Sequence, residues 1–100
     1  MDISGNSSLK SLLCRTNQLS SIDISNNPQL NFLSIGNNDL TTIDLSQHTN
    51  FSGLTIENND LTSIDISQNP MLKSLNIGNN NLSNIDVSNN PLLEFLYVDD

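Results

Sequence analysis

The chain repeats itself every 21 residues, and this period restricts its fold more than any other feature of the sequence. Two of the repeating columns are leucine at Leu12, Leu33, Leu54, Leu75 and Leu96, and aspartate at Asp23, Asp44, Asp65 and Asp86. The register extends to both ends of the chain, because Asp2-Ile3-Ser4 matches Asp23-Ile24-Ser25 and Tyr97-Val98 matches Asn76-Ile77. A fixed period of this length predicts stacked copies of one supersecondary unit.

Each repeat, here called a coil, divides into two similar halves. In the coil spanning residues 30–50 they read Leu30-x-x-Leu33-x-Ile35-x-x-Asn38 and Leu40-x-x-Ile43-x-Leu45-x-x-His48. Both halves have the apolar-x-apolar alternation of a short strand with one buried face, and Gly-Asn-Asn or Ser-Asn-Asn-Pro segments between them predict turns. We therefore expect a β-rich solenoid with two short parallel strands per coil, stacked into two parallel sheets, with little or no α-helix.

The predicted core consists of about six inward side chains per coil. In the coil at 30–50 these are Leu30, Leu33, Ile35, Leu40, Ile43 and Leu45. One coil cannot bury its apolar face alone, so stability must come from stacking. We expect a single domain of about five coils over residues 1–100. Neither end carries an evident cap, which predicts a fragment of a longer protein or ends that associate with another copy.

The repeat resembles the leucine-rich-repeat family, whose unit reads LxxLxLxxN. It is more closely similar to a bacterial subclass with nested LxxLxLxxNxLxxLDLxxN units, sometimes called IRREKO repeats. The fourth coil carries that motif as Leu72-x-x-Leu75-x-Ile77-x-x-Asn80-x-Leu82-x-x-Ile85-Asp86-Val87-Ser88-x-Asn90. The resemblance implies a leucine-rich-repeat solenoid from a secreted or cell-surface bacterial protein that binds or adheres, and it does not identify the ligand.

Charge and hydropathy exclude several partners. Three scattered basic residues, Lys10, Arg15 and Lys73, stand against eleven acidic ones, so binding to nucleic acid or to an anionic membrane is not expected. No apolar run approaches the ~18 residues that a membrane-spanning helix needs, and no signal peptide is visible. A single cysteine cannot form an internal disulfide. The expected localisation therefore rests on the family resemblance alone.

Two polar columns follow the two halves of each coil. Asparagines that close the halves, such as Asn38 and Asn69, are expected to satisfy backbone groups at the turns. The aspartates of the second half are expected to point outward in a ladder ~4.8 Å apart, flanked by serines that can donate to them. Calcium binding or ice binding by this Asp/Ser face is a remote alternative. The Gly-Gly-x-Gly-x-Asp pattern of calcium-binding β-rolls is absent, so no metal site is predicted.

The outward positions of the first half vary from coil to coil, as a recognition surface requires. One column reads Ser11, Phe32, Gly53, Ser74, Phe95; the next reads Leu13, Ser34, Thr55, Asn76, Tyr97; a third reads Arg15, Gly36, Glu57, Gly78, Asp99. The candidate ligand surface comprises Leu13, Phe32, Ser34, Thr55, Asn76, Phe95 and Tyr97. Aromatic side chains anchor interfaces more than most others, so Phe95 and Tyr97 are its sharpest members. An alternative for these two residues is contact with a following coil or cap. The equally weighted alternative for all the variable positions is that they are tolerated surface residues without a ligand.

Nothing in the sequence predicts catalysis or a cofactor. Cys14 occupies an isoleucine column and is expected to be a buried, inert thiol without a neighbouring base. His48 stands alone in a column of asparagines, which indicates a turn residue. The chain is therefore predicted to be a non-catalytic binding or adhesion module that presents its repeat surface to a protein or glycan. The alternative is a structural spacer or assembly scaffold without a specific ligand.

Overall fold

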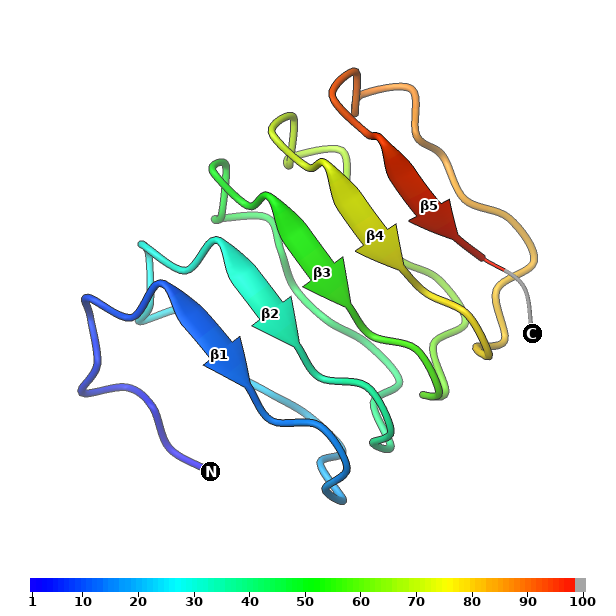
Figure 1. Ribbon diagram of the computed structural model, residues 1–100. Helices are drawn as coiled ribbons and strands as arrows, with labels where there is room; N and C mark the ends of the chain where they lie inside the picture. The colour runs from blue at the N-terminus through cyan, green and yellow to red at the C-terminus, as the bar shows by residue number, and fades with distance from the viewer. Residues whose placement is uncertain (99–100) are drawn as a thin grey trace.

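The computed structural model describes residues 1–98, which wind into a solenoid with a parallel sheet along one side (Figure 1). Neighbouring strands follow chain order, β1-β2-β3-β4-β5, so each coil returns beside the preceding one. No described residue lies in a helix. The strands are β1 (Ser11–Leu13), β2 (Phe32–Ser34), β3 (Gly53–Thr55), β4 (Ser74–Asn76) and β5 (Phe95–Tyr97).

The strands pair in register with an offset of one repeat. The central leucine of β3, Leu54, lies opposite Leu33 of β2 on one side and opposite Leu75 of β4 on the other. The same offset relates β1 to β2 and β4 to β5. This pairing confirms the predicted stacking of equivalent residues, because a slip of one residue would turn the leucines toward solvent.

Aliphatic columns fill the space between the two halves of the coils. Leu33, Leu54 and Leu75 from the strands are each at most 1% exposed, and Leu40 and Leu61 from the opposite half are fully buried. Five of the six core residues predicted for the coil at 30–50 are buried, and the sixth, Ile43, is half-buried against the same cluster. Each fully buried aliphatic side chain contributes about 1.5–3 kcal/mol. The buried residues from Cys14 to Ile77 form one cluster, so the core is continuous from coil to coil.

The second half of each coil forms no strand in residues 1–98, so the predicted second sheet is wrong. Side-chain oxygens accept hydrogen bonds from backbone N–H groups that a second ladder of paired strands would need. The Leu40 N–H donates to Asn59 Oδ1 at 2.9 Å, and the Ser46 N–H donates to Asp44 Oδ1 at 3.0 Å. Between the coils at 30–50 and 51–71, this half retains the bond from the Asp60 N–H to the Leu40 carbonyl at 2.8 Å. This half of the coil is therefore not paired as a strand.

Turns align along both edges of the sheet and hold the strands in place (Figure 1). After the strands the chain turns through left-handed residues, Asn37, Asn58 and Asn79, with φ between 52° and 58°. Asparagine tolerates this conformation better than most residues do. The first coil has Thr16 at the equivalent position, with φ 57°. The described residues contain no helix long and apolar enough to span a bilayer.

Candidate functional site

The outward side chains of the five strands form one continuous surface, here called the sheet face. It comprises Ser11, Leu13, Phe32, Ser34, Gly53, Thr55, Ser74, Asn76, Phe95 and Tyr97. Because successive side chains of a strand point to opposite sides, the residues that flank each buried central leucine face away from the core. All seven residues of the candidate ligand surface therefore lie on the sheet face.

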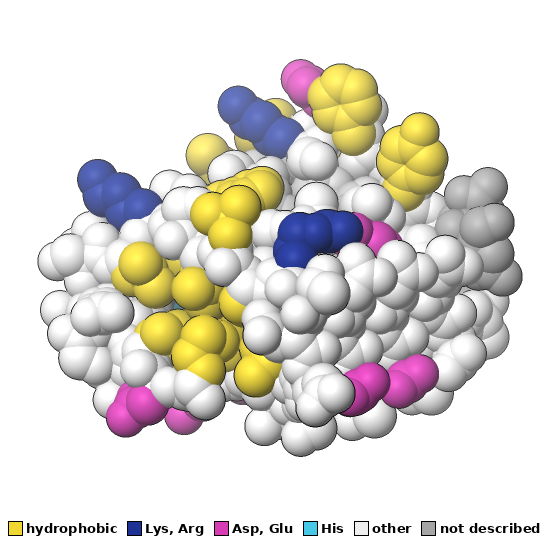
Figure 2. Space-filling view, turned by 60° about the horizontal axis from the view of Figure 1, so that its bottom comes forward, with side chains coloured by type: hydrophobic (Ala, Val, Ile, Leu, Met, Phe, Trp, Pro, Cys, Tyr) yellow, Lys and Arg dark blue, Asp and Glu magenta, His cyan; other side chains and the backbone are white. Residues whose placement is uncertain are grey.

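These candidate residues differ in exposure. Leu13, Phe95 and Tyr97 are 71%, 63% and 65% exposed. They lie on the outermost strands, β1 and β5, and Figure 2 shows hydrophobic and cationic side chains at the surface of the molecule on this side. Phe32, Thr55 and Asn76 are half-buried, and Ser34 is buried. The accessible apolar groups are therefore concentrated at the two ends of the sheet face.

The Phe32 ring lies over Gly53 of β3, where the missing side chain leaves room for it. A β-carbon on Gly53 would come within 2.7 Å of Phe32 Cδ1, which is closer than real β-carbons approach. The missing side chain lets the aromatic ring rest on the backbone of the next strand. The pairing of Phe32 with Gly53 is visible in the sequence columns, but the contact depends on ring orientation and could not be predicted from them.

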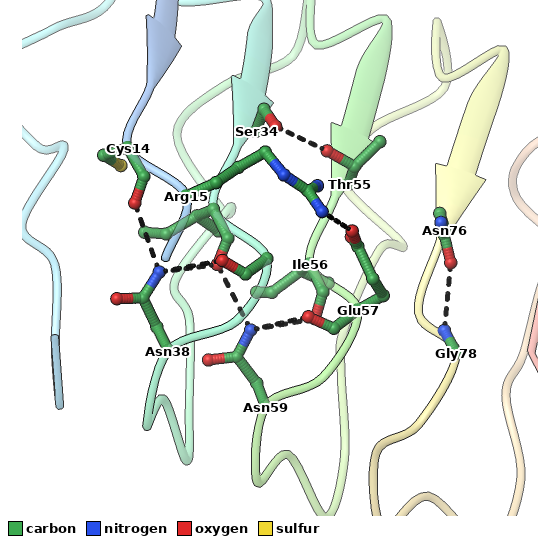
Figure 3. A network of polar contacts seen from close by, with 12 residues as sticks. Cys14, Arg15, Ser34, Asn38, Thr55, Ile56, Glu57, Asn59, Asn76 and Gly78 are labelled. Atoms are coloured by element: carbon green, nitrogen blue, oxygen red, sulfur yellow. Dashed lines mark hydrogen bonds and ion pairs between the residues drawn. The ribbon is translucent and has the colours of Figure 1, made fainter. Parts of the chain in front are cut away.

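An ion pair that skips one coil lies beside the sheet face, just beyond the C-terminal ends of β1 and β3 (Figure 3). Arg15, two residues after β1, pairs with Glu57, two residues after β3. Gly36 separates them, and a β-carbon there would lie 2.6 Å from the Glu57 carboxyl carbon. Beside this pair the Thr55 hydroxyl donates to the Ser34 hydroxyl at 3.0 Å. Arg15, Gly36 and Glu57 belong to one column of the sequence, but the column does not predict the ion pair. Asp99 of the same column lies outside the described residues.

The Glu57 carboxylate is held on one side only. One oxygen pairs with Arg15, whereas Oε2 is buried without a hydrogen-bond partner in the described part of the chain. The Glu57 side chain is 13% exposed and the Arg15 side chain is 41% exposed. An unpartnered buried carboxylate oxygen loses hydration that nothing replaces. The Arg15–Glu57 pair therefore leaves one buried oxygen of the Glu57 carboxylate unsatisfied, which costs free energy.

The asparagine columns have the structural role that the sequence predicts. In the first column, Asn59 Nδ2 donates to the carbonyls of Ile56 at 3.0 Å and Ile35 at 3.2 Å, so one amide joins two coils (Figure 3). In the second column, Asn69 Nδ2 donates to the carbonyls of Leu45 at 3.1 Å and His48 at 2.9 Å. Neither arrangement presents the amide to a ligand.

His48 replaces asparagine in the second column and makes the corresponding contacts. Its Nε2 lies 3.1 Å from the carbonyl oxygens of both Ile24 and Asn27. Both neighbours are acceptors, so Nε2 carries the proton. The ring is 2% exposed and packs edge-on against Phe51, with the ring centroids 5.9 Å apart. His48 is a turn residue, as predicted.

The aspartate column is exposed and hydrogen-bonded to its own coil. Asp44 Oδ1 accepts from the Ser46 backbone N–H at 3.0 Å and from the Ser46 hydroxyl at 2.6 Å, and Asp23 and Asp65 bind Ser25 and Ser67 in the same way. These serine hydrogen bonds lower the pKa of each carboxyl. Among residues 1–98, no group of three His, Cys, Asp or Glu side chains is placed to hold a metal ion.

Cys14 is buried at 8% exposure in the column of Ile35 and Ile56, and burial raises the pKa of its thiol. The thiol is therefore protonated at neutral pH and is a poor nucleophile. This position confirms the sequence-based prediction that Cys14 packs as a small apolar residue.

The fold matches solved leucine-rich-repeat structures over nearly its whole length. No protein-family model matches the chain, and no curated protein matches its sequence. A leucine-rich-repeat protein of Leptospira interrogans superimposes with a TM-score of 0.88 over 97% of the chain, at 25% identity. The chain has the fold of a leucine-rich-repeat solenoid.

A second solved structure extends this comparison. The functional domain of InlJ from Listeria monocytogenes, described as including a cysteine ladder, superimposes with the solenoid with a TM-score of 0.78 over 99% of the chain, at 26% identity. The solenoid spans 27% of the length of each of these two neighbours. Where InlJ is described with a ladder of cysteines, this solenoid has a single cysteine, Cys14.

Proposed function

We propose that this leucine-rich-repeat solenoid is a non-catalytic module that binds a protein or glycan through its sheet face, as part of a secreted or cell-surface bacterial protein. One observation carries the proposal: the sheet face varies from coil to coil and exposes Leu13, Phe95 and Tyr97, whereas the opposite side repeats one hydrogen-bonded Asp-x-Ser unit. Large exposed apolar side chains are common anchors of interfaces.

Three further findings support this function. Both solved neighbours are leucine-rich-repeat proteins of bacteria, and one of them is described as a functional domain. The thiol of Cys14 is buried, and the ring of His48 is held at Nε2 by two carbonyls, so neither group is placed to act on a substrate. A role as a structural spacer is the competing proposal, and it predicts that no face recognises anything.

The test begins with selection of binders from a peptide display library and a glycan array, using the immobilised chain. Binders are then measured against a sheet-face variant, Leu13→Ser with Phe95→Ser and Tyr97→Ser. A matched control, Met71→Ser with Leu92→Ser, removes apolar side chains that are also exposed, at 45% and 43%, but lie outside the sheet face.

Loss of a central anchor costs about 2 kcal/mol or more in binding, a weakening of about 30-fold. We expect that loss in the sheet-face variant, with unchanged binding in the control and little change in melting temperature in either. Equal binding by the wild type and the sheet-face variant would show that the sheet face is not the binding surface. Specific hits from neither library would favour the spacer.

A further inference from the structure

The charges of this solenoid are segregated between its two sides. All three basic residues adjoin the strands: Lys10 and Lys73 immediately precede β1 and β4, and Arg15 follows β1. The nine described acidic residues divide unequally, because two glutamates adjoin the strands and seven aspartates lie in the turns and second halves. Among residues 1–98 the strand side therefore carries a net charge of +1 (three basic residues against two glutamates), whereas these residues together carry −6 (three basic against nine acidic). Figure 2 shows the three cationic groups on one side of the molecule.

One carboxylate already lies beside the sheet face. Glu57 rests on Arg15 in the space that Gly36 leaves open, and its second oxygen is buried without a partner. A guanidinium can bind a carboxylate through two parallel hydrogen bonds. Because Glu57 is seated with one unsatisfied oxygen, an incoming carboxylate that satisfies both of its own oxygens can compete for Arg15.

We infer that the partner of the sheet face is an acidic protein segment, whose carboxylates contact Lys10, Arg15 and Lys73 while Glu57 occupies Arg15 in the unbound state. This inference rests on the proposed function and names the chemistry of its partner. Apolar side chains of the same segment would contact Leu13 at one end and Phe95 and Tyr97 at the other, where the exposed hydrophobic groups lie.

The spacing of the cations sets the length of such a segment. Lys10 and Lys73 precede strands that are three positions apart in the sheet. Adjacent strands lie about 4.8 Å apart, so the two lysines are separated by about 14 Å along the solenoid, a span of four to five extended residues at about 3.3 Å each. A short extended peptide that runs along the N-terminal ends of the strands therefore reaches both lysines. The Arg15–Glu57 pair lies beyond the opposite ends of β1 and β3, so contact with Arg15 needs further residues of the segment.

The experiment measures binding of fluorescent peptides to the 100-residue chain by anisotropy. The acidic probe alternates Glu and Tyr, and the neutral probe replaces each Glu with Gln. We expect the wild type to prefer the acidic probe, with affinity that falls as salt is raised from about 0.05 M to about 0.5 M because surface charges are screened. Equal binding of the two probes, or of neither, would overturn the inference.

Two pairs of variants locate the effect. Lys10→Gln with Lys73→Gln should weaken binding of the acidic probe about five- to tenfold. Its control, Gln18→Glu with Gln68→Glu, changes net charge equally at exposed positions outside the sheet face and should have little effect. Glu57→Gln should tighten binding severalfold because Arg15 loses its internal competitor. Asp60→Asn removes one exposed negative charge elsewhere and serves as its control.

The outcomes separate this inference from the proposed function. If each variant behaves like its control, the charges act only through the net charge and the inference fails. If selected binders depend on Leu13, Phe95 and Tyr97 but not on the lysines or on salt, the sheet face is a binding surface with a different partner chemistry. If a sulfated glycan binds and the acidic peptide does not, the commitment to a protein segment is wrong.

Discussion

Replacing Asn59 by alanine should destabilise the solenoid far more than the same replacement at Asn17, although both residues belong to one repeating column. Asn59 is 6% exposed, and its Oδ1 accepts from the Leu40 N–H at 2.9 Å. Its Nδ2 donates to the Ile56 and Ile35 carbonyls at 3.0 Å and 3.2 Å. The side chain therefore joins two coils at a buried position.

The magnitude follows from which groups the change leaves without a partner. The Ile35 and Ile56 carbonyls each keep a second donor, from Asn38 Nδ2 at 3.0 Å and Asn80 Nδ2 at 3.1 Å. The Leu40 N–H has no such alternative. One stranded buried donor costs about 1–3 kcal/mol, and two lost carbonyl bonds add about 0.5 kcal/mol or more each, so we expect a loss of about 3 kcal/mol.

Asn17 provides the matched control. It is exposed, and its Nδ2 donates to the carbonyls of Cys14 at 3.0 Å and Arg15 at 3.2 Å. Among the described residues, no backbone N–H donates to its side-chain oxygen. Asn17→Ala therefore strands no buried donor, and we expect a loss of less than about 1 kcal/mol.

The assay is urea unfolding followed by far-ultraviolet circular dichroism, because the chain has no tryptophan to report by fluorescence. A loss of about 3 kcal/mol should also lower the melting temperature by more than about 10 °C in a domain of this size. Equal losses of unfolding free energy for Asn59→Ala and Asn17→Ala would refute the reasoning, because the hydrogen bond from the Leu40 N–H would then make no measurable contribution to stability.

Three other changes test separate features of the fold. Thr16→Asn should raise the free energy of unfolding by about 1 kcal/mol, because asparagine tolerates the left-handed φ better than a β-branched residue does; urea unfolding would measure it. His48→Asn should fold with nearly unchanged stability. His48→Leu should lose about 1 kcal/mol or more, because the Ile24 and Asn27 carbonyls each lose one of their two donors and keep only a backbone N–H, as thermal melting of both variants would show. Ser46→Ala should raise the pKa of Asp44 toward its ordinary value in an NMR titration. A carboxyl whose pKa is lowered by folding stabilises the fold above its unfolded pKa and loses that contribution as pH falls through the folded pKa. Ser46→Ala removes part of this contribution, so the variant should be slightly less stable at neutral pH and should lose less stability than the wild type as the pH is lowered.

Periodicity predicted the parts of the fold that depend on side-chain direction alone. Leu33, Leu54 and Leu75 share a column in the sequence and stack in the structure because each coil has the same length. The second sheet was predicted on the same grounds and does not form, because apolar alternation says nothing of where backbone donors go. The Asp44-x-Ser46 segment could have predicted this, because aspartate often accepts a hydrogen bond from the backbone N–H two residues later and is depleted in strands.

The sheet face was predictable as a set of columns but not as a set of contacts. Phe32 above Gly53 and Arg15 across Gly36 depend on how far a side chain reaches over one or two strand spacings, which the period does not specify. The position of the lysines was accessible from the period: Lys10 and Lys73 are 63 residues apart, which is three repeats, so they belong to one column and are not scattered.

The variability of the sheet face follows from where this solenoid places its stabilising contacts. The leucine columns, the asparagine columns and the ladder between strands all lie in the core, the turns or the backbone, so most sheet-face side chains can change without loss of the fold. The exceptions are the positions at which one coil reaches over the next. Phe32 and Glu57 occupy the space that a side chain at residue 53 or residue 36 would take, so one of them would have to shift if either glycine were replaced. Substitutions on this face are therefore coupled at intervals of one and two repeats, and a change in specificity at one strand must be accommodated on its neighbour.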